Sequence, residues 1–253
     1  MKDISATVKS NVLIAENIYK MELTLSEDVG EIHGGQFINL STGDNTHLLR
    51  RPLGVMKVEG NDISVCYQLK GDGTQTLSKA QAGQQLKVLL PLGNGFDLSG
   101  KKNIAVIGGG VGIFPLIATI REHCKDKNFY SYIGFRNKNA VCLLDELEKS
   151  KTLTVVTDDG SVGAKGNAVD AYLKDADELN VDLIISCGPP VMLKVLKQKL
   201  EERKNSIPCL VSLEERMGCG IGACLVCVCK KGVGENVRVC KDGPVFDINE
   251  VQL

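Results

Sequence analysis

Cysteines gather near the end of the chain, in the stretch "EERMGCGIGACLVCVCKKG" and shortly after it. Cys219, Cys224, Cys227 and Cys240 are separated by four, two and twelve residues, and Cys229 is a fifth thiol in the same region. The first three match the C-x4-C-x2-C spacing of plant-type [2Fe–2S] proteins. The spacing predicts that these four thiols ligate a [2Fe–2S] cluster. We expect Cys229 to be left out, because using it as the third ligand would lose the two-residue spacing.

Glycines between the cysteines favour the same prediction. Gly218, Gly220 and Gly222 leave a loop with little side-chain bulk, so backbone N–H groups can approach the sulfur atoms, and hydrogen bonds of that kind also tune the potential. Two alternatives stay open. Four thiolates could hold structural zinc, although zinc usually draws on two close cysteine pairs and only Cys224 and Cys227 form one. The thiols could also be free or redox-active.

A glycine-rich segment, "AVIGGGVGIFP", lies between an apolar run and a helical pattern. Gly108, Gly109, Gly110 and Gly112 would let the backbone approach a pyrophosphate at the N-terminus of the following helix. The segment is not a strict G-x-G-x-x-G motif, because Ile113 occupies the third glycine position. A glycine turn between strand and helix is also common for structural reasons alone.

A second segment strengthens the nucleotide prediction. "CGPPVML", with Cys187, Gly188 and Pro189, follows another apolar run, and ligands of open α/β sheets collect where the parallel strands end. Arg136 in "GFRNKN" stands where an acidic residue would mark NAD specificity. The choice between NAD and NADP therefore stays open on the residues alone.

A weaker phosphate signal lies earlier in the chain. "HLLRRPLGVMKV" places arginines beside one predicted strand, and "YQLKGDGTQTLS" leads from another strand into a helix through Gly73 and Thr74. A basic residue beside a helix start can bind phosphate. The alternative is a surface arginine and an ordinary helix cap, with Thr74 as N-cap and Gly83 as the helix stop.

Two rhythms of hydrophobicity position these motifs. The first part of the chain has short alternating segments such as "DISVCYQLK", "GQFINLS" and "QQLKVLLPLG", which predict half-buried antiparallel strands in a small barrel. From Lys101, continuous apolar runs alternate with helical patterns, which predicts a doubly wound parallel sheet. We expect a β-barrel over residues 1–98, an α/β domain over 99–210 and a small cluster domain over 211–253.

Composition restricts the class of protein. The formal net charge is −1, with 30 basic and 31 acidic residues, so no basic excess would attract nucleic acid. The longest uncharged run, Ile104 to Ile120, is shorter than a spanning helix requires and is broken by glycines. The N-terminus lacks the apolar core of a secretory signal. Ten cysteines without such a signal favour a cytoplasmic protein.

The order of barrel, nucleotide-type sheet and cysteine-rich tail resembles the ferredoxin-NADP reductase superfamily. Within it, the chain is most similar to the electron-transfer subunits of class B dihydroorotate dehydrogenases. The resemblance covers essentially the whole chain, and the segments that carry it are "RRPLGV", "GDGT", "GGGVGIFPL", "CGPPVML" and above all "SLEERMGCGIGACLVCVC".

The resemblance implies FAD, a [2Fe–2S] cluster and NAD as cofactors. It implies that Arg51, Pro52, Leu53 and Gly54 line the flavin and its phosphates, that Cys66, Tyr67 and Gln68 border the adenosine side, and that Gly73 and Thr74 hold the pyrophosphate. The superfamily pattern Arg-x-Tyr-Ser/Thr is not kept. Leu53 and Gly54 replace the aromatic ring and the hydroxyl, so the usual contact near flavin N5 must come from elsewhere.

The resemblance also implies a function. Electrons from dihydroorotate would reach FMN on a separate catalytic subunit, cross to the [2Fe–2S] cluster and FAD, and reduce NAD+, in a heterotetramer with two copies of each subunit, without membrane or nucleic acid. No catalytic acid or base is expected, and the three histidines, His33, His47 and His123, are scattered. The alternatives are another NAD(P)H-linked flavin and iron–sulfur relay, or a non-enzymatic iron–sulfur or zinc redox sensor.

Overall fold

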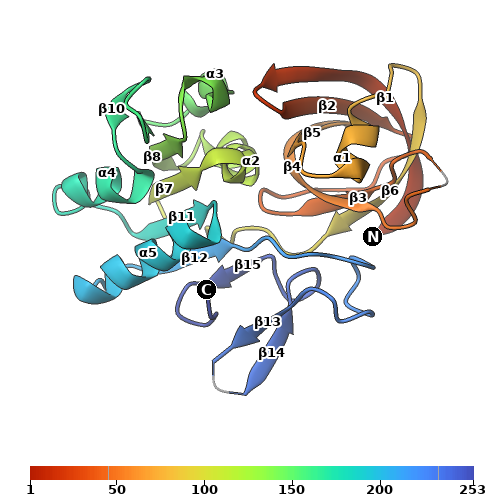
Figure 1. The fold of residues 1–253 in the computed structure, drawn as a ribbon. Helices are drawn as coiled ribbons and strands as arrows, with labels where there is room; N and C mark the ends of the chain where they lie inside the picture. Colours follow the sequence, from red (N-terminus) through yellow and green to blue (C-terminus); the bar gives the residue numbers. More distant parts are fainter. Residues whose placement is uncertain (45, 233) are drawn as a thin grey trace.

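The structure, a computed structural model, describes residues 1–44, 46–232 and 234–253. Six strands of the first part close into an antiparallel barrel in the order β1-β2-β5-β4-β3-β6 (Figure 1). These are β1 (Lys2–Ala15), β2 (Ile18–Leu25), β3 (Phe37–Leu40), β4 (Arg51–Glu59), β5 (Asp62–Gln68) and β6 (Gln85–Leu92). The predicted barrel is confirmed.

One detail of the barrel differs from the prediction. We expected β5 to be half-buried, but five of its seven residues in a row are buried. Val65 and Tyr67 pack inside the barrel, whereas Cys66 on the opposite face packs with Met56 and Ile113 in a core shared with the α/β domain. The outer face of this strand is buried at Cys66 because this residue lies in the seam between the two domains.

The helix predicted after "KGDG" is shorter than expected. Helix α1 spans Asp72–Leu77, with Gly71 as its N-cap and its end well before Gly83. Thr74 is therefore inside the first turn. Its hydroxyl accepts from the N–H groups of Lys70 (2.9 Å) and Gly71 (3.2 Å) and donates to the Gly71 carbonyl (2.8 Å). Through these three hydrogen bonds, the Thr74 side chain closes the loop that leads into the helix.

The second part forms a seven-stranded sheet in the order β10-β9-β8-β7-β11-β12-β15. All neighbouring strands are parallel except β12 and β15, as expected for a doubly wound sheet with an antiparallel edge. The strands are β7 (Asn103–Gly109), β8 (Asn128–Phe135), β9 (Thr152–Thr157), β10 (Ala164–Lys165), β11 (Leu183–Cys187), β12 (Cys209–Ser212) and β15 (Val245–Asp247).

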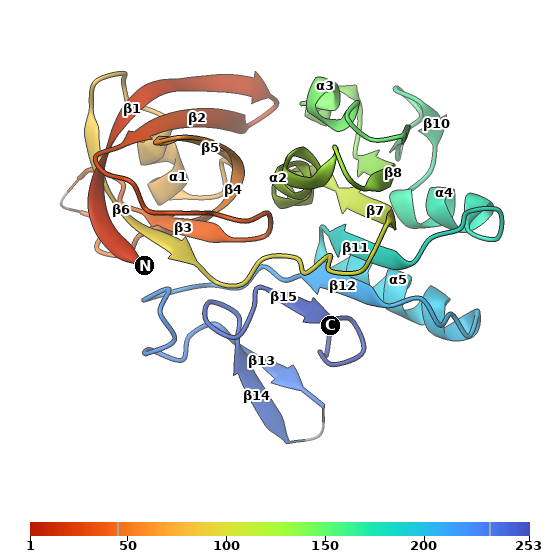
Figure 2. The ribbon, with the colours of Figure 1, turned by 180° about the vertical axis from the view of Figure 1, so that it is seen from behind.

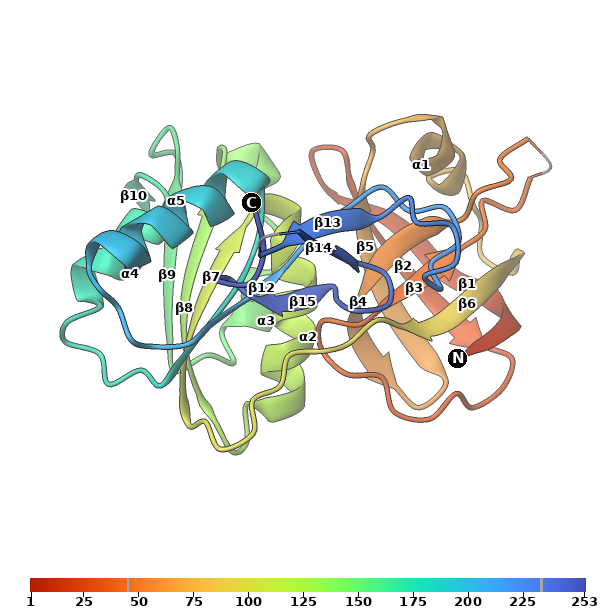
Figure 3. The same ribbon diagram turned by 90° about the horizontal axis from the view of Figure 1, so that it is seen from below.

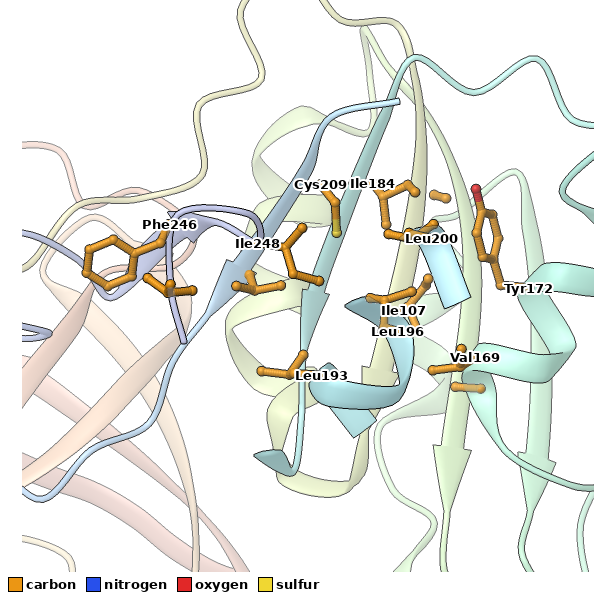
Figure 4. Packing of buried hydrophobic residues seen from close by; sticks show 14 of the residues in the cluster. Ile107, Val169, Tyr172, Ile184, Leu193, Leu196, Leu200, Cys209, Phe246 and Ile248 are labelled. Atoms are coloured by element: carbon orange, nitrogen blue, oxygen red, sulfur yellow. The ribbon is translucent and has the colours of Figure 1, made fainter. Parts of the chain in front are cut away.

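Helices cover both faces of this sheet, as Figure 3 shows. Helix α2 (Ile113–His123) and helix α3 (Leu144–Leu147) lie on the face toward the barrel; α4 (Ala168–Asp175) and α5 (Pro190–Glu202) lie on the other. In Figure 4, Leu193, Leu196 and Leu200 of α5 and Tyr172 of α4 point toward Ile107 and Ile184 of the sheet. The 3-10 helices η1 (Gly110–Gly112) and η2 (Lys138–Ala140) complete the helical elements of the described residues.

The cysteine-rich segment leaves the sheet after β12 and returns to it at β15. Between them stand the cluster loop, which we define as residues 217–227, and the hairpin of β13 (Val228–Lys231) and β14 (Glu235–Arg238), below the other two layers in Figure 2. Phe246 and Ile248 pack into the core of the sheet. The third unit thus shares the hydrophobic core of the second, and the predicted boundaries at residues 98 and 210 stay predictions.

No helix among the described residues is long and apolar enough to cross a membrane.

Candidate functional site

A cavity of about 530 Å³ lies between the barrel and the sheet. Eight predicted residues line it: Pro52, Leu53 and Gly54 of β4, Cys66, Tyr67 and Gln68 of β5, Thr74 of α1, and Cys187 at the end of β11. Its opposite wall comes from Val111, Phe114 and Pro115, and from residues 212–217 of the segment that leads to the cysteines. The structure therefore brings together, in one cavity, residues from the three segments that the resemblance assigned to FAD, in β4, β5 and α1. Cys187, from the predicted NAD set, lines the same cavity.

Like Gly73, Arg51 does not line this cavity, so its contact with the flavin phosphates stays a prediction. Its guanidinium lies against Gly73, in the space that a side chain at position 73 would fill, and it donates to the Leu49 carbonyl. A cation over the first turn of a helix suits a phosphate group. The N–H of Thr74 donates to the Gly71 carbonyl at 3.0 Å, so the pyrophosphate contact of Thr74 remains a prediction.

A second cavity, of about 660 Å³, opens at the carboxyl ends of the parallel strands. Five of the predicted nucleotide residues line it: Gly109, Gly110, Gly112, Gly188 and Pro189. Gly108 does not line it, so its part in nucleotide binding stays a prediction. A Cβ there would stand 2.9 Å from the Ile133 side chain on β8 and 3.1 Å from the Ile113 side chain on α2, so this glycine allows the strands and the helix to pack closely.

The two nucleotide segments touch through their backbones. A Cβ on Gly112 would lie 2.5 Å from the carbonyl carbon and oxygen of Cys187 and 2.6 Å from the nitrogen of Gly188. Only glycine allows this approach. The exposed Arg136 side chain lines the same cavity, which keeps it in the position from which it would face the adenosine ribose.

Sequence reasoning missed part of both cavities. The tip of the β1–β2 hairpin, with Glu16 and Asn17, reaches across to the nucleotide cavity, and the Glu16 N–H donates to the Asn139 carbonyl at 2.9 Å. Lys70 and Glu214 line both cavities, with 3.9 Å between the ammonium and carboxylate groups. Lys70 and Glu214 lie in segments quoted above, but no role for them follows from the sequence, because they meet only when the barrel, sheet and tail are folded together.

The cysteines form two pairs. The N–H of Cys219 donates to the Cys224 sulfur at 3.3 Å, and the N–H of Cys224 donates to the Cys219 sulfur at 3.4 Å. The Cys240 N–H donates to the Cys227 sulfur at 3.4 Å. Gly222 connects the pairs, because its N–H donates to the Cys240 sulfur at 3.1 Å from within the loop that carries Cys219.

This arrangement suits a cluster better than a single ion. Across the described ranges, no three ligating side chains stand close enough to share one metal ion. A zinc site would gather four thiolates around one centre, whereas a [2Fe–2S] cluster takes two on each iron. Burial alone would raise the pKa of the Cys219 thiol, but hydrogen bonds from the N–H groups of Ile221, Cys224 and Ala223 lower this pKa to about 6. A metal ligand must be deprotonated, so these donors favour metal binding.

Cys229 lies on strand β13, paired with Val237 across the hairpin. Burial raises the pKa of its thiol. The structure gives it none of the backbone N–H donors that surround Cys219 and Cys240 among the described residues. Its exclusion from the ligand set stays a prediction.

The cluster loop lies directly beside the first cavity, between the barrel and the sheet, which we call the flavin cavity. Met217 lines that cavity and precedes Cys219 by two residues. Gly220 (φ +74°) presses against the barrel, where a Cβ would stand 2.5 Å from Nδ2 of Asn39. Asn39 on β3 donates to the Cys219 carbonyl at 3.4 Å, and its buried Oδ1 has no partner among the described residues.

The three histidines stand apart from these cavities. His33 pairs with Glu122 at 2.6 Å and His47 with Asp44 at 2.9 Å, while His123 lies 3.7 Å from Glu122. Each histidine ring thus contacts a carboxylate outside both cavities, and the structural role expected of the histidines stays a prediction.

Two family descriptions match the chain. Residues 214–252 match the iron–sulfur cluster binding domain of dihydroorotate dehydrogenase B, and residues 106–198 match the oxidoreductase NAD-binding domain. The first contains all four predicted ligands, and the second contains both nucleotide segments.

Whole-chain relatives agree with these matches. The chain is 40% identical over 263 residues to a Bacillus velezensis protein and 39% identical over 257 residues to a Streptococcus mutans protein, both named dihydroorotate dehydrogenase B (NAD+), electron transfer subunit. The alignments cover 100% of both chains in the first case, and 98% of this chain and 97% of the relative in the second.

Solved structures share the architecture. An NADH-dependent reduced ferredoxin-NADP oxidoreductase chain superposes with a TM-score of 0.86 at 29% identity, over 98% of this chain and 89% of that one. Phthalate dioxygenase reductase, at 15% identity and a TM-score of 0.70 over 94% of each chain, shares the fold. With a flavin-type barrel, a nucleotide sheet and a cluster segment in one order, the chain belongs to the family of electron-transfer subunits of NAD+-dependent dihydroorotate dehydrogenase B.

Proposed function

We propose that this protein carries electrons from a separate, FMN-containing dihydroorotate dehydrogenase catalytic subunit to NAD+. Dihydroorotate gives up two electrons and two protons in this reaction, and NAD+ takes up the equivalent of a hydride while one proton is released. The observation that carries the proposal is the continuity of the site. Residues 214–217 line the flavin cavity and run directly into Cys219, so the flavin and cluster sites adjoin.

The chain's own residues bind and orient the cofactors. Arg51 would neutralise flavin phosphate. Leu53, Gly54 and Tyr67, which line the cavity, would form the wall against the flavin and its adenosine. When bound, FAD supplies the exchange between two-electron transfer with nicotinamide and one-electron transfer with the cluster. Gly109, Gly110 and Gly112 would hold the dinucleotide so that its nicotinamide reaches the flavin.

The metal ligands in this proposal are Cys219, Cys224, Cys227 and Cys240. Cys187 and the neighbouring Gly188 and Pro189 stand where the two cavities meet, since Cys187 lines the flavin cavity while the next two residues line the nucleotide cavity. This segment would therefore position the nicotinamide over the flavin. We keep NAD as the nucleotide, in line with the family.

The catalytic subunit would dock on the cluster loop. Leu225 and Val226, between the second and third ligands, are 62% and 56% exposed, and Ile221 is 42% exposed. Apolar side chains exposed beside a redox centre suit a partner interface. We propose that two copies of each subunit assemble in this way, and that the complex works in the cytoplasm, where thiols stay reduced.

The test is dihydroorotate-dependent NAD+ reduction by the protein purified with its catalytic subunit. Cys224→Ala should abolish this activity, while NADH oxidation by ferricyanide through the flavin should persist. Cys229→Ala is the matched control and should retain both activities. Intact dihydroorotate-dependent reduction in Cys224→Ala would refute the proposed electron path, and reduced ferredoxin as the better electron donor would favour a different relay.

A further inference from the structure

An arginine is fixed beside the cluster loop by a carboxylate. Arg238 ends strand β14, two residues before the ligand Cys240. Its Nε and one terminal nitrogen donate to the two carboxylate oxygens of Asp242, at 3.0 Å and 2.9 Å, and its backbone N–H donates to the same group at 2.8 Å. A planar guanidinium that is bound through two of its three nitrogens keeps one orientation. The guanidinium is therefore held in place on the protein.

The third nitrogen of this guanidinium faces the cluster loop. Its second terminal nitrogen, Nη1, donates to the Gly222 carbonyl at 3.4 Å. The N–H of Gly222 in turn donates to the Cys240 sulfur at 3.1 Å. Arg238 is thus connected to a ligand sulfur through one residue, and Gly222 is held from both of its peptide groups.

The fit at this point is close. Gly222 has φ +82°, and a Cβ there would stand 3.4 Å from Nη1 of Arg238 and 2.7 Å from the Lys241 side chain. Both side chains therefore lie against the loop backbone. The Arg238 and Asp242 side chains are each 32% exposed, so solvent screens this charge less than that of a free surface arginine.

The ion pair is oriented with respect to the loop. Asp242 occupies the edge formed by Nε and Nη2, while Nη1 faces Gly222. The pair as a whole is neutral, but its positive side faces the loop. Reduction of a [2Fe–2S] cluster adds one electron and hence one negative charge, which a nearby positive charge and hydrogen bonds to the sulfurs stabilise.

We propose that Arg238 is a positioning residue that raises the reduction potential of the cluster, by directing positive charge at the loop and by holding the Gly222 N–H on the Cys240 sulfur. Asp242 sets the extent of the effect, because its carboxylate orients the guanidinium and offsets part of its charge. This inference rests on the cluster assignment proposed above.

The test is an anaerobic redox titration of the full chain loaded with flavin and cluster, followed by the electron paramagnetic resonance signal of the reduced cluster. Arg238→Gln should lower the ratio of reduced to oxidised cluster at fixed potential by about tenfold, which is about 59 mV for one electron. Arg238→Lys, which keeps the charge and loses the fork, should fall between this variant and the wild type. Asp242→Asn should shift the ratio in the opposite direction.

Arg203→Gln is the matched control, because it removes another arginine–aspartate pair, with Asp177, beyond the end of helix α5. It should leave the midpoint unchanged. Equal midpoints in Arg238→Gln and Arg203→Gln would overturn the inference, as would a shift in the same direction in Arg238→Gln and Asp242→Asn. Loss of iron from both Arg238 variants, with flavin retained, would show a structural role instead. Absence of any cluster signal in the wild type would refute the cluster assignment itself.

Discussion

The contact between Gly112 and the segment after β11 offers the sharpest test of the nucleotide site. Alanine at position 112 would place a methyl group 2.5 Å from the backbone of Cys187 and 2.6 Å from that of Gly188. Backbone atoms cannot move aside as a flexible side chain can. The two segments that line the nucleotide cavity must therefore separate in Gly112→Ala.

The magnitude follows from the strain of overpacking, which typically costs about 1–3 kcal/mol. Without nucleotide, the variant relieves this strain by moving residue 112 away from the backbone of Cys187 and Gly188. Nucleotide binding requires the two segments at their original distance. Binding must therefore restore the strain. At about 1.4 kcal/mol per factor of ten, we expect the affinity for NADH to fall by about 5- to 150-fold. Iron content should not change, because Gly112 is not part of the cluster site. Flavin content is measured in parallel, because Cys187 also lines the flavin cavity.

The assay is NADH oxidation with ferricyanide as acceptor, with KM and a directly titrated Kd measured separately. Gly188→Ala is the graded control. A Cβ there would stand 2.5 Å from the end of the Met192 side chain, which can rotate away, and 3.1 Å from the backbone nitrogen of Gly109. Because this backbone contact is longer than those at Gly112, the variant should lose less affinity. A Gly112→Ala protein with its flavin in place and a Kd within twofold of the wild type would refute the reasoning, and so would a larger loss in Gly188→Ala.

Three further predictions concern the other sites. Gly220→Ala should lower the iron content per chain, because residue 220 has φ +74° and a methyl group there would stand 2.5 Å from Nδ2 of Asn39; adding Asn39→Ala should restore part of the iron. Arg51→Ala should weaken FAD binding by about 10- to 150-fold, the loss of a charged hydrogen bond of about 1.5–3 kcal/mol, measured as the flavin-to-protein absorbance ratio after dialysis. Burial opposes ionisation of Glu146, but hydrogen bonds from Lys149 and Arg121 lower the pKa of this carboxyl below 4.5. The stabilisation is therefore present above pH 4.5 and lost as the pH falls through the folded-state pKa, so the advantage of the wild type over Glu146→Gln in chemical unfolding should shrink on acidification.

Much of the fold could be predicted from hydrophobic patterns. The strand around "DISVCYQLK" and the alternating strands and helices from Lys101 onward are present as predicted, because a period of two or a continuous apolar run depends on local burial. The errors arose where another element supplied the environment. Cys66 is buried from outside the barrel by the α/β domain, and α1 begins at Asp72 because the Thr74 hydroxyl closes the preceding loop.

The site divides in the same way. Cluster ligation depends on short loops, so the spacing of Cys219, Cys224 and Cys227 was sufficient to predict the iron–sulfur segment that the family description matches over residues 214–252. The individual ligands stay a prediction. The sequence by itself thus determined the cofactor class, the order of the three parts and the glycine segments. Only the tertiary structure decided that Lys70 and Glu214 line both cavities and that Arg238 faces Gly222. Such contacts join residues far apart in the chain, and their geometry depends on the packing of whole elements, which no local spacing records.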